Sequence, residues 1–245
     1  MEGRPPGPLA RVARLVVPVE CPGCGLPDVR WCEECEAPWW EEPLRCDSGA
    51  PRLGALEPRL PVWSVVELDG PAHALIGAWK DAGRRDLAGL FEPAMARAVA
   101  QIAPALAGVG GVERWRVVPC PARAAHTRSR GANLPLGLAR AAAAGLEAAG
   151  VRASVADVLA PSRGSSRGAG DRGRWRAGGA ALRRRADRES AAPVMLVDDV
   201  LTTGATLARA ARALGASALV PVAGIVLASA PGPTRWRDRP PGALL

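Results

Sequence analysis

The sequence predicts an α/β domain with a mostly parallel sheet flanked by helices, preceded by a small cysteine-rich segment. Short β-branched runs alternate with longer Ala- and Leu-rich segments between residues 62 and 230, at the spacing of strand–helix–strand units. Nearly half of the 245 residues are apolar (48%), which is enough for one domain with a buried core and a small appendage. Five of the six cysteines fall within residues 21–46.

The periodicity of apolar residues predicts the elements in chain order. We expect strands at residues 62–68, 115–121, 153–159 and 194–199, and a final strand or strand pair at residues 218–228. We expect helices at residues 87–107, 134–149 and 206–214. Pro- and Gly-rich stretches divide the chain into a cysteine-rich arm at 1–50, a linker at 51–61, the main domain at 62–230 and a flexible tail at 231–245.

The net charge of +8 favours anionic partners, which include phosphorylated small molecules, nucleic acid and acidic surfaces, without choosing among them. The chain does not start with a basic segment followed by an apolar run. Its longest apolar stretch, residues 216–230, is short and is interrupted by Pro221 and Gly224. We therefore expect a cytoplasmic protein without a membrane span, in which paired cysteines indicate a metal site rather than disulfides.

The strongest functional signal is the segment from Val194 to Thr206. An apolar strand ends in Asp198 and Asp199, a loop of small and hydroxyl residues follows, and a helix begins directly after the loop. The residues of this pattern are Asp198, Asp199, Thr202, Thr203, Gly204, Ala205 and Thr206.

Ligands of open α/β sheets bind beyond the carboxyl ends of the strands, and the first amides of a helix readily bind phosphate. Two carboxylates placed just before such a loop suit the neutral hydroxyls of a ribose, or a magnesium ion. The order of the residues therefore predicts a ribose 5-phosphate site. The alternative is a buried strand followed by a capped helix, with one of the aspartates as a structural cap.

Four cysteines form two C-x-x-C pairs, a spacing that can present four thiolates to one tetrahedral zinc ion. They are Cys21, Cys24, Cys32 and Cys35. Bound metal would stabilise so small and polar a segment, and a site of four thiolates is structural rather than catalytic. The alternatives are two disulfides or a redox-active pair. Cys46 and Cys120 lack a paired neighbour, and the sequence assigns them no role.

The segment Val194–Thr206 closely resembles the signature of type I phosphoribosyltransferases. This resemblance implies that Asp198 and Asp199 hold the ribose hydroxyls of phosphoribosyl diphosphate. It also implies that the loop from Thr202 to Thr206 holds the 5′-phosphate, and that magnesium accompanies the diphosphate.

A cysteine ribbon followed by such a domain resembles the ComF family of competence proteins. Residues 76–91 are similar to the family's Lys-x-x-Gly-x-Arg-x-Leu-Ala segment, and residues 117–133 to its Val-Pro-x-Pro stretch. The resemblance implies that the loop after the strand at 115–121 binds diphosphate, through Arg123, Arg128, Arg130 and Gly131. The alternative for this loop is a solvated basic segment. Lys80 could reach the ligand or pair with Asp81 or Asp86.

The Arg-, Gly- and Ser-rich residues 162–185 stand where this family has a flexible active-site loop, although the Gln-bearing and acidic part of that loop is replaced. The segment suits a phosphate-binding lid or a basic segment that contacts nucleic acid. The resemblance thus predicts transfer of a phosphoribosyl group to a nitrogen base. The second hypothesis is a non-catalytic protein that binds a phosphoribosyl ligand together with single-stranded DNA or a DNA-uptake protein. A third is a zinc-ribbon DNA binder with an inert core.

Overall fold

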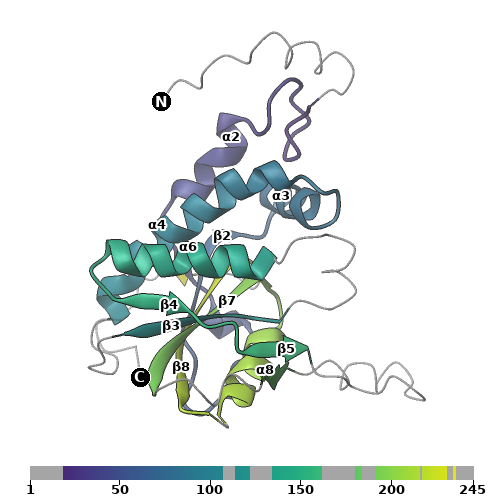
Figure 1. Cartoon of the computed structure of the whole chain (residues 1–245). Helices are drawn as coiled ribbons and strands as arrows, with labels where there is room; N and C mark the ends of the chain where they lie inside the picture. Colours follow the sequence, from purple (N-terminus) through teal and green to yellow (C-terminus); the bar gives the residue numbers. More distant parts are fainter. Residues whose placement is uncertain are drawn as a thin grey trace, which may run out of the picture.

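The structure is a computed structural model that describes residues 19–106, 114–121, 134–161, 180–183, 191–215, 217–230 and 234–235. The predicted α/β fold, with a mostly parallel sheet flanked by helices and an N-terminal cysteine cluster, is confirmed (Figure 1). The helices are α2 (Glu33–Glu36), α3 (Gly70–Lys80), α4 (Ala88–Leu106), α6 (Leu134–Ala148) and α8 (Ala205–Leu214), with 3-10 turns η1 (Ala37–Trp40), η2 (Asp47–Gly49) and η3 (Arg85–Leu87). The strands are β1 (Leu44–Arg45), β2 (Val62–Glu67), β3 (Trp115–Pro119), β4 (Ala153–Val155), β5 (Leu159–Pro161), β6 (Ala180–Leu182), β7 (Ala192–Leu201), β8 (Leu219–Ser229) and β9 (Thr234–Arg235).

The main sheet has the strand order β4-β3-β7-β8-β2-β1-β9, and its first five strands run parallel. The two short strands β1 and β9 are antiparallel at one edge. From β3 the chain moves outward to β4 and then returns to β7 on the other side of β3. The carboxyl ends of β3 and β7 therefore form a topological switch point, the usual ligand position in open α/β sheets.

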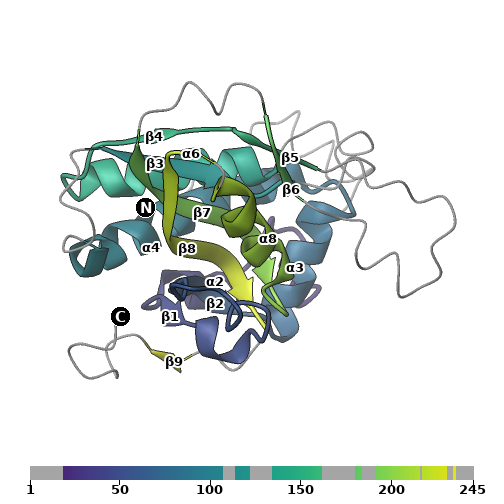
Figure 2. The ribbon, with the colours of Figure 1, turned by 90° about the horizontal axis from the view of Figure 1, so that it is seen from below.

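Each face of the sheet has its own apolar core, because successive side chains of a strand point to opposite faces. On β7, Met195 and Val197 join the core beneath α3, α4 and α6, whereas Val194 and Leu196 join the core beneath α8. Figure 2 shows α8 in front of β7 and β8, with α4 and α6 beyond the sheet.

Most of the predicted elements are present, with differences at their ends. The strand predicted at 153–159 is divided, because the chain leaves the main sheet after β4 and pairs as β5 with β6. The final predicted element, at 218–228, is a single long strand, β8. The first five residues of β2 are all buried, because both faces of this strand are covered.

The cysteine-rich segment packs directly on the main domain. The buried ring of Trp39, in η1, lies with its centroid 4.6 Å from that of Phe91 in α4, and Trp79 of α3 lies 5.1 Å from the same ring. The Arg84 guanidinium, held by Asp86, donates hydrogen bonds of 2.9 Å to the carbonyls of Glu20 and Arg30. The segment is thereby fixed to α3 and α4.

Residues 51–61 also contribute to the core, since Leu53, Leu56 and Leu60 are buried beneath α8 and the sheet. The domain boundaries themselves stay predictions. Of the predicted tail at 231–245, the structure describes only β9. Within the described residues, no helix is both long and apolar enough to cross a bilayer.

Candidate functional site

Strand β7 carries Asp198 and Asp199 to the carboxyl edge of the sheet, at the switch point with β3. The strand extends two residues beyond each end of the predicted range, and at the carboxyl end Val200 and Leu201 still pair with β8. Helix α8 starts at Ala205, so that Thr206 lies in its first turn and the loop consists of Thr202, Thr203 and Gly204. The predicted pattern of strand, two acids, short loop and helix is therefore present as one continuous structure.

Gly204 begins the helix in a left-handed backbone conformation, with a φ of 74°. This conformation disfavours any residue with a Cβ atom. A Cβ atom here would also lie 2.6 Å from Cγ of Leu53. In addition, the Arg52 amide donates a hydrogen bond of 3.0 Å to the carbonyl of Thr203. The segment just before β2 thus supports the loop from outside, a contact that the sequence did not predict.

Asp198 is a buried carboxyl group, with 9% of its surface exposed. Its Oδ1 atom accepts a hydrogen bond of 2.9 Å from the backbone N–H of Asp199. Burial, and then the neighbouring charge of Asp199, raise the pKa of Asp198 to about 8, against the opposing effects of this amide, Lys80 and Arg209. At neutral pH much of the protein therefore carries Asp198 in its protonated form.

Asp199 forms an ion pair with Lys80, the last residue of α3, at 2.8 Å between Oδ2 and Nζ. The expected alternative partner Asp86 is instead bound by Arg84 through two hydrogen bonds of 2.9 and 2.8 Å. Lys80 therefore reaches the candidate site. Its place in residues 76–91, one of the stretches that carry the resemblance, was the only signal in the sequence for this contact.

Cys120 lies directly after β3 and is buried beside the acid pair. Its amide donates a hydrogen bond of 2.8 Å to the carbonyl of Val197. Burial raises the pKa of its thiol well above the usual value, and the charges of Asp198 and Asp199 act in the same direction. Cys120 is therefore a neutral residue lining this edge, a position that sequence reasoning did not assign.

The other predicted ligand residues cannot be placed in the same way. Arg123, Arg128, Arg130 and Gly131 lie outside the described residues, as does most of the predicted lid at 162–185. The diphosphate loop and the lid thus stay predictions, and the described site consists of the acid pair, Lys80, Cys120 and the Thr202–Thr206 loop.

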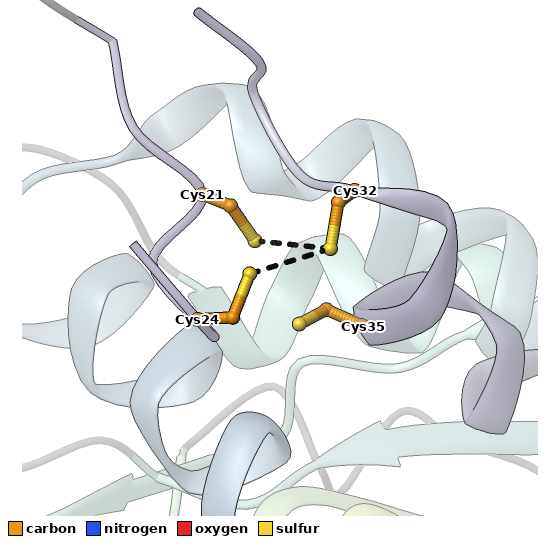
Figure 3. Close-up of side chains that lie close together, drawn as sticks. All are labelled: Cys21, Cys24, Cys32 and Cys35. Atoms are coloured by element: carbon orange, nitrogen blue, oxygen red, sulfur yellow. Dashed lines mark hydrogen bonds between the residues drawn. The ribbon is translucent and has the colours of Figure 1, made fainter. Parts of the chain in front are cut away.

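The four predicted metal ligands form a second site, in which their sulfur atoms point toward one another (Figure 3). All four sulfur atoms lie within 4.8 Å of one another, with 3.8 Å between Cys21 and Cys32 and 3.5 Å between Cys24 and Cys32. Four thiolates at about 2.3 Å from a tetrahedral zinc ion would be about 3.8 Å apart. None of these cysteines forms a disulfide. The cluster could therefore hold one structural zinc ion.

Local backbone structure explains why the cysteines converge. The Gly25 amide donates to the Cys21 carbonyl at 2.8 Å, which closes a tight turn, and Gly25 has a φ of 80°. A Cβ atom on Gly23 would lie 2.6 Å from the Cys35 sulfur, so a larger residue would push into the cluster. Cys32 precedes α2 and Cys35 lies within it.

The electrostatics of the four-cysteine cluster favour a bound cation. Although burial acts to raise the pKa of Cys21, neighbouring backbone amides outweigh it and lower this pKa to about 7. Burial raises the pKa of Cys35, and the other three sulfurs raise it further. Four adjacent thiols cannot all ionise unless a cation compensates their charge, and zinc would supply that compensation.

Comparison with protein-family models and with curated proteins returned no match. The family resemblance therefore rests on the sequence motifs.

Proposed function

We propose that this chain binds a 5-phosphoribosyl ligand, phosphoribosyl diphosphate in the first place, at the carboxyl end of β7. The observation that carries the proposal is the continuous arrangement of Asp198 and Asp199, a loop of three residues and the start of α8 at the topological switch point. The two acids would accept hydrogen bonds from ribose hydroxyls. The loop and the first turn of α8 would hold the 5′-phosphate through backbone amides and threonine hydroxyls.

The type I phosphoribosyltransferase and ComF resemblances support the same ligand. On this proposal, magnesium would accompany the diphosphate, and the transferase would join the phosphoribosyl group to a nitrogen base. Binding has stronger support than transfer, because the described residues include those that we propose to hold the ribose and the 5′-phosphate. The residues expected to hold the diphosphate and to close over it lie outside them.

The second candidate function is that of a non-catalytic binding protein with a nucleic acid partner. The distribution of charge along the chain indicates which part would bind the nucleic acid. Residues 19–50, which contain the cysteine cluster, have eight acidic residues and two arginines, whereas the whole chain carries +8. Nucleic acid binding depends on neutralising phosphates with basic side chains. Any nucleic acid would therefore bind the basic remainder of the chain rather than the cysteine ribbon.

Titration calorimetry with phosphoribosyl diphosphate and magnesium tests the proposed function. We expect binding by the wild type and at least a tenfold loss of affinity in the double variant Asp198→Asn/Asp199→Asn. The matched control is Glu67→Gln/Asp69→Asn, which removes two exposed acids at the carboxyl end of β2, a strand that β8 separates from β7. A folded, zinc-loaded wild type that does not bind would refute the proposal, as would equal binding by the acid-pair variant.

A further inference from the structure

Lys80 occupies a defined place in the candidate site. Its Nζ atom lies 2.8 Å from Oδ2 of Asp199, and the two side chains are 25% and 19% exposed, so solvent reaches this ion pair only in part. Lys80 follows the buried Trp79 and ends α3, which fixes the start of its side chain. A cation at the C-terminal end of a helix is further favoured by the helix dipole.

Two basic side chains oppose the negative charge of the acid pair. Burial favours the protonated form of Asp198, so its carboxyl group carries less negative charge than an exposed carboxylate does. Asp199 is then the principal anion, and Lys80 compensates it within the distance of a strong ion pair. Arg209 on α8 adds a second positive charge that acts on Asp198.

This arrangement of charges distinguishes between two possible ligands, a magnesium ion and the hydroxyl groups of a sugar. An Asp-Asp sequence alone does not distinguish them. Magnesium requires near-octahedral oxygen ligands and commonly uses one or two carboxylates, so it would compete with Lys80 for Asp199 and be repelled by its ammonium group. Hydroxyl groups carry no charge and are not repelled. A protonated Asp198 can also donate one hydrogen bond to a hydroxyl and accept another.

We infer that Lys80 is a built-in counter-cation that makes the Asp198–Asp199 pair a site for the neutral hydroxyls of a sugar phosphate and excludes divalent metal ions from these carboxylates. This inference rests on the proposed function for the identity of the sugar ligand. The exclusion of metal ions depends only on the ion pair. Magnesium would then enter the site on the diphosphate of the ligand and not on the protein.

The test uses Mn²⁺ as a paramagnetic probe, because it shares the preference of magnesium for oxygen ligands. Zinc-loaded wild type is compared with Lys80→Met, with Lys80→Arg, which keeps the charge, and with Arg59→Met, which removes an exposed charge elsewhere. We expect Lys80→Met to bind one Mn²⁺ at least about tenfold more tightly than the other three proteins. Adding Asp199→Asn to Lys80→Met should abolish this gain.

A second arm measures ribose 5-phosphate without metal. Lys80→Met should weaken its binding about tenfold, and Lys80→Arg should retain most of it. Mn²⁺ binding by the wild type that is lost in Asp199→Asn would overturn the inference, and so would a Lys80→Met protein that gains no metal site. If the wild type excludes Mn²⁺ but binds no ribose 5-phosphate, the sugar-phosphate assignment fails, and with it the proposed function, while the exclusion of metal stands.

Discussion

At the scale of single residues, the candidate site contains a group that opposes the stability of the fold. The Asp198 carboxyl is buried at the end of β7 and has its pKa raised to about 8, first by burial and then by Asp199. The folded protein therefore binds this proton more tightly than the unfolded chain does. In a structural residue such a cost would bring no benefit, which makes Asp198 a candidate for function.

The substitution Asp198→Asn should stabilise the protein in a manner that depends on pH. Because the folded pKa lies above the unfolded value, this group favours folding most below about pH 4, and that contribution is lost as the pH rises toward 8. The variant cannot ionise, so its free energy of unfolding should exceed that of the wild type by roughly 1–2 kcal/mol at pH 5 and by up to about 5 kcal/mol at pH 8.

Urea denaturation from pH 5 to pH 8.5 measures this difference. The exposed acid Glu67, changed to Gln, is the control and should give a small difference that does not change with pH. A difference between Asp198→Asn and the wild type that stays constant over this range would contradict the raised pKa.

At the scale of elements, apolar periodicity was enough to locate most of the large elements. The helices near 88–106 and 134–148 and the strands near 62–67 and 115–119 were predicted within a few residues. Periodicity is a local property, so it does not specify that β8 lies between β7 and β2. It also missed α3 and the two-residue strands β1 and β9.

The candidate sites show the same difference between local sequence patterns, which were predicted, and contacts between distant residues, which were not. The four cysteines and the segment from Asp198 to Thr206 are contiguous patterns, and the sequence sufficed to locate them. The ion pair between Lys80 and Asp199 and the contact of Leu53 with Gly204 join residues far apart in the chain. Such contacts depend on tertiary packing, which a single sequence does not specify.

The contact at Gly204 leads to a prediction about the loop between β7 and α8. Gly204→Ala should destabilise the protein by roughly 1–3 kcal/mol, because alanine is strained at a φ of 74° and its Cβ atom would lie 2.6 Å from Leu53. It should also weaken ligand binding, since the loop must shift away from Leu53.

The matched control is Gly77→Ala in α3, where an added Cβ atom meets nothing within 4 Å. This change should stabilise the protein by about 0.5–1 kcal/mol, because alanine favours a helix interior more than glycine does. Thermal denaturation of both variants measures the two effects. Equal stability of Gly204→Ala and the wild type would show that Leu53 does not constrain the loop.

At the scale of the whole molecule, the cysteine cluster and the candidate ligand site are both attached to one helix and the turn that follows it. The C-terminal end of α3 contributes Lys80 to the acid pair, and Arg84, four residues later, holds the carbonyls on both sides of the cysteine turn. Trp79 adds an aromatic contact between α3 and α4, and Phe91 also contacts Trp39. The metal site should therefore stabilise the main domain as well as its own segment.

The purified protein should contain one zinc ion per chain, and its removal by a chelator should lower the melting temperature by about 5–10 °C, or roughly 2–4 kcal/mol. Cys35→Ala should give the same loss and a zinc content near zero. Cys46→Ala is the control, because this buried cysteine lies outside the cluster. Atomic emission and thermal denaturation give the two readings, and full stability after complete removal of zinc would contradict the coupling.

The pairing of β2 with β8 has a consequence for folding of the chain during translation. Val62 pairs with Gly224 and Glu67 with Ser229, so β2 gains its parallel neighbour only after more than 150 further residues have been synthesised. Contacts between such distant segments slow folding and leave apolar strands unpaired in the meantime. A nascent chain that ends before residue 219 lacks β8 and leaves this edge of the apolar strand β2 unpaired. We therefore expect chaperones to bind the nascent chain until β8 has been synthesised.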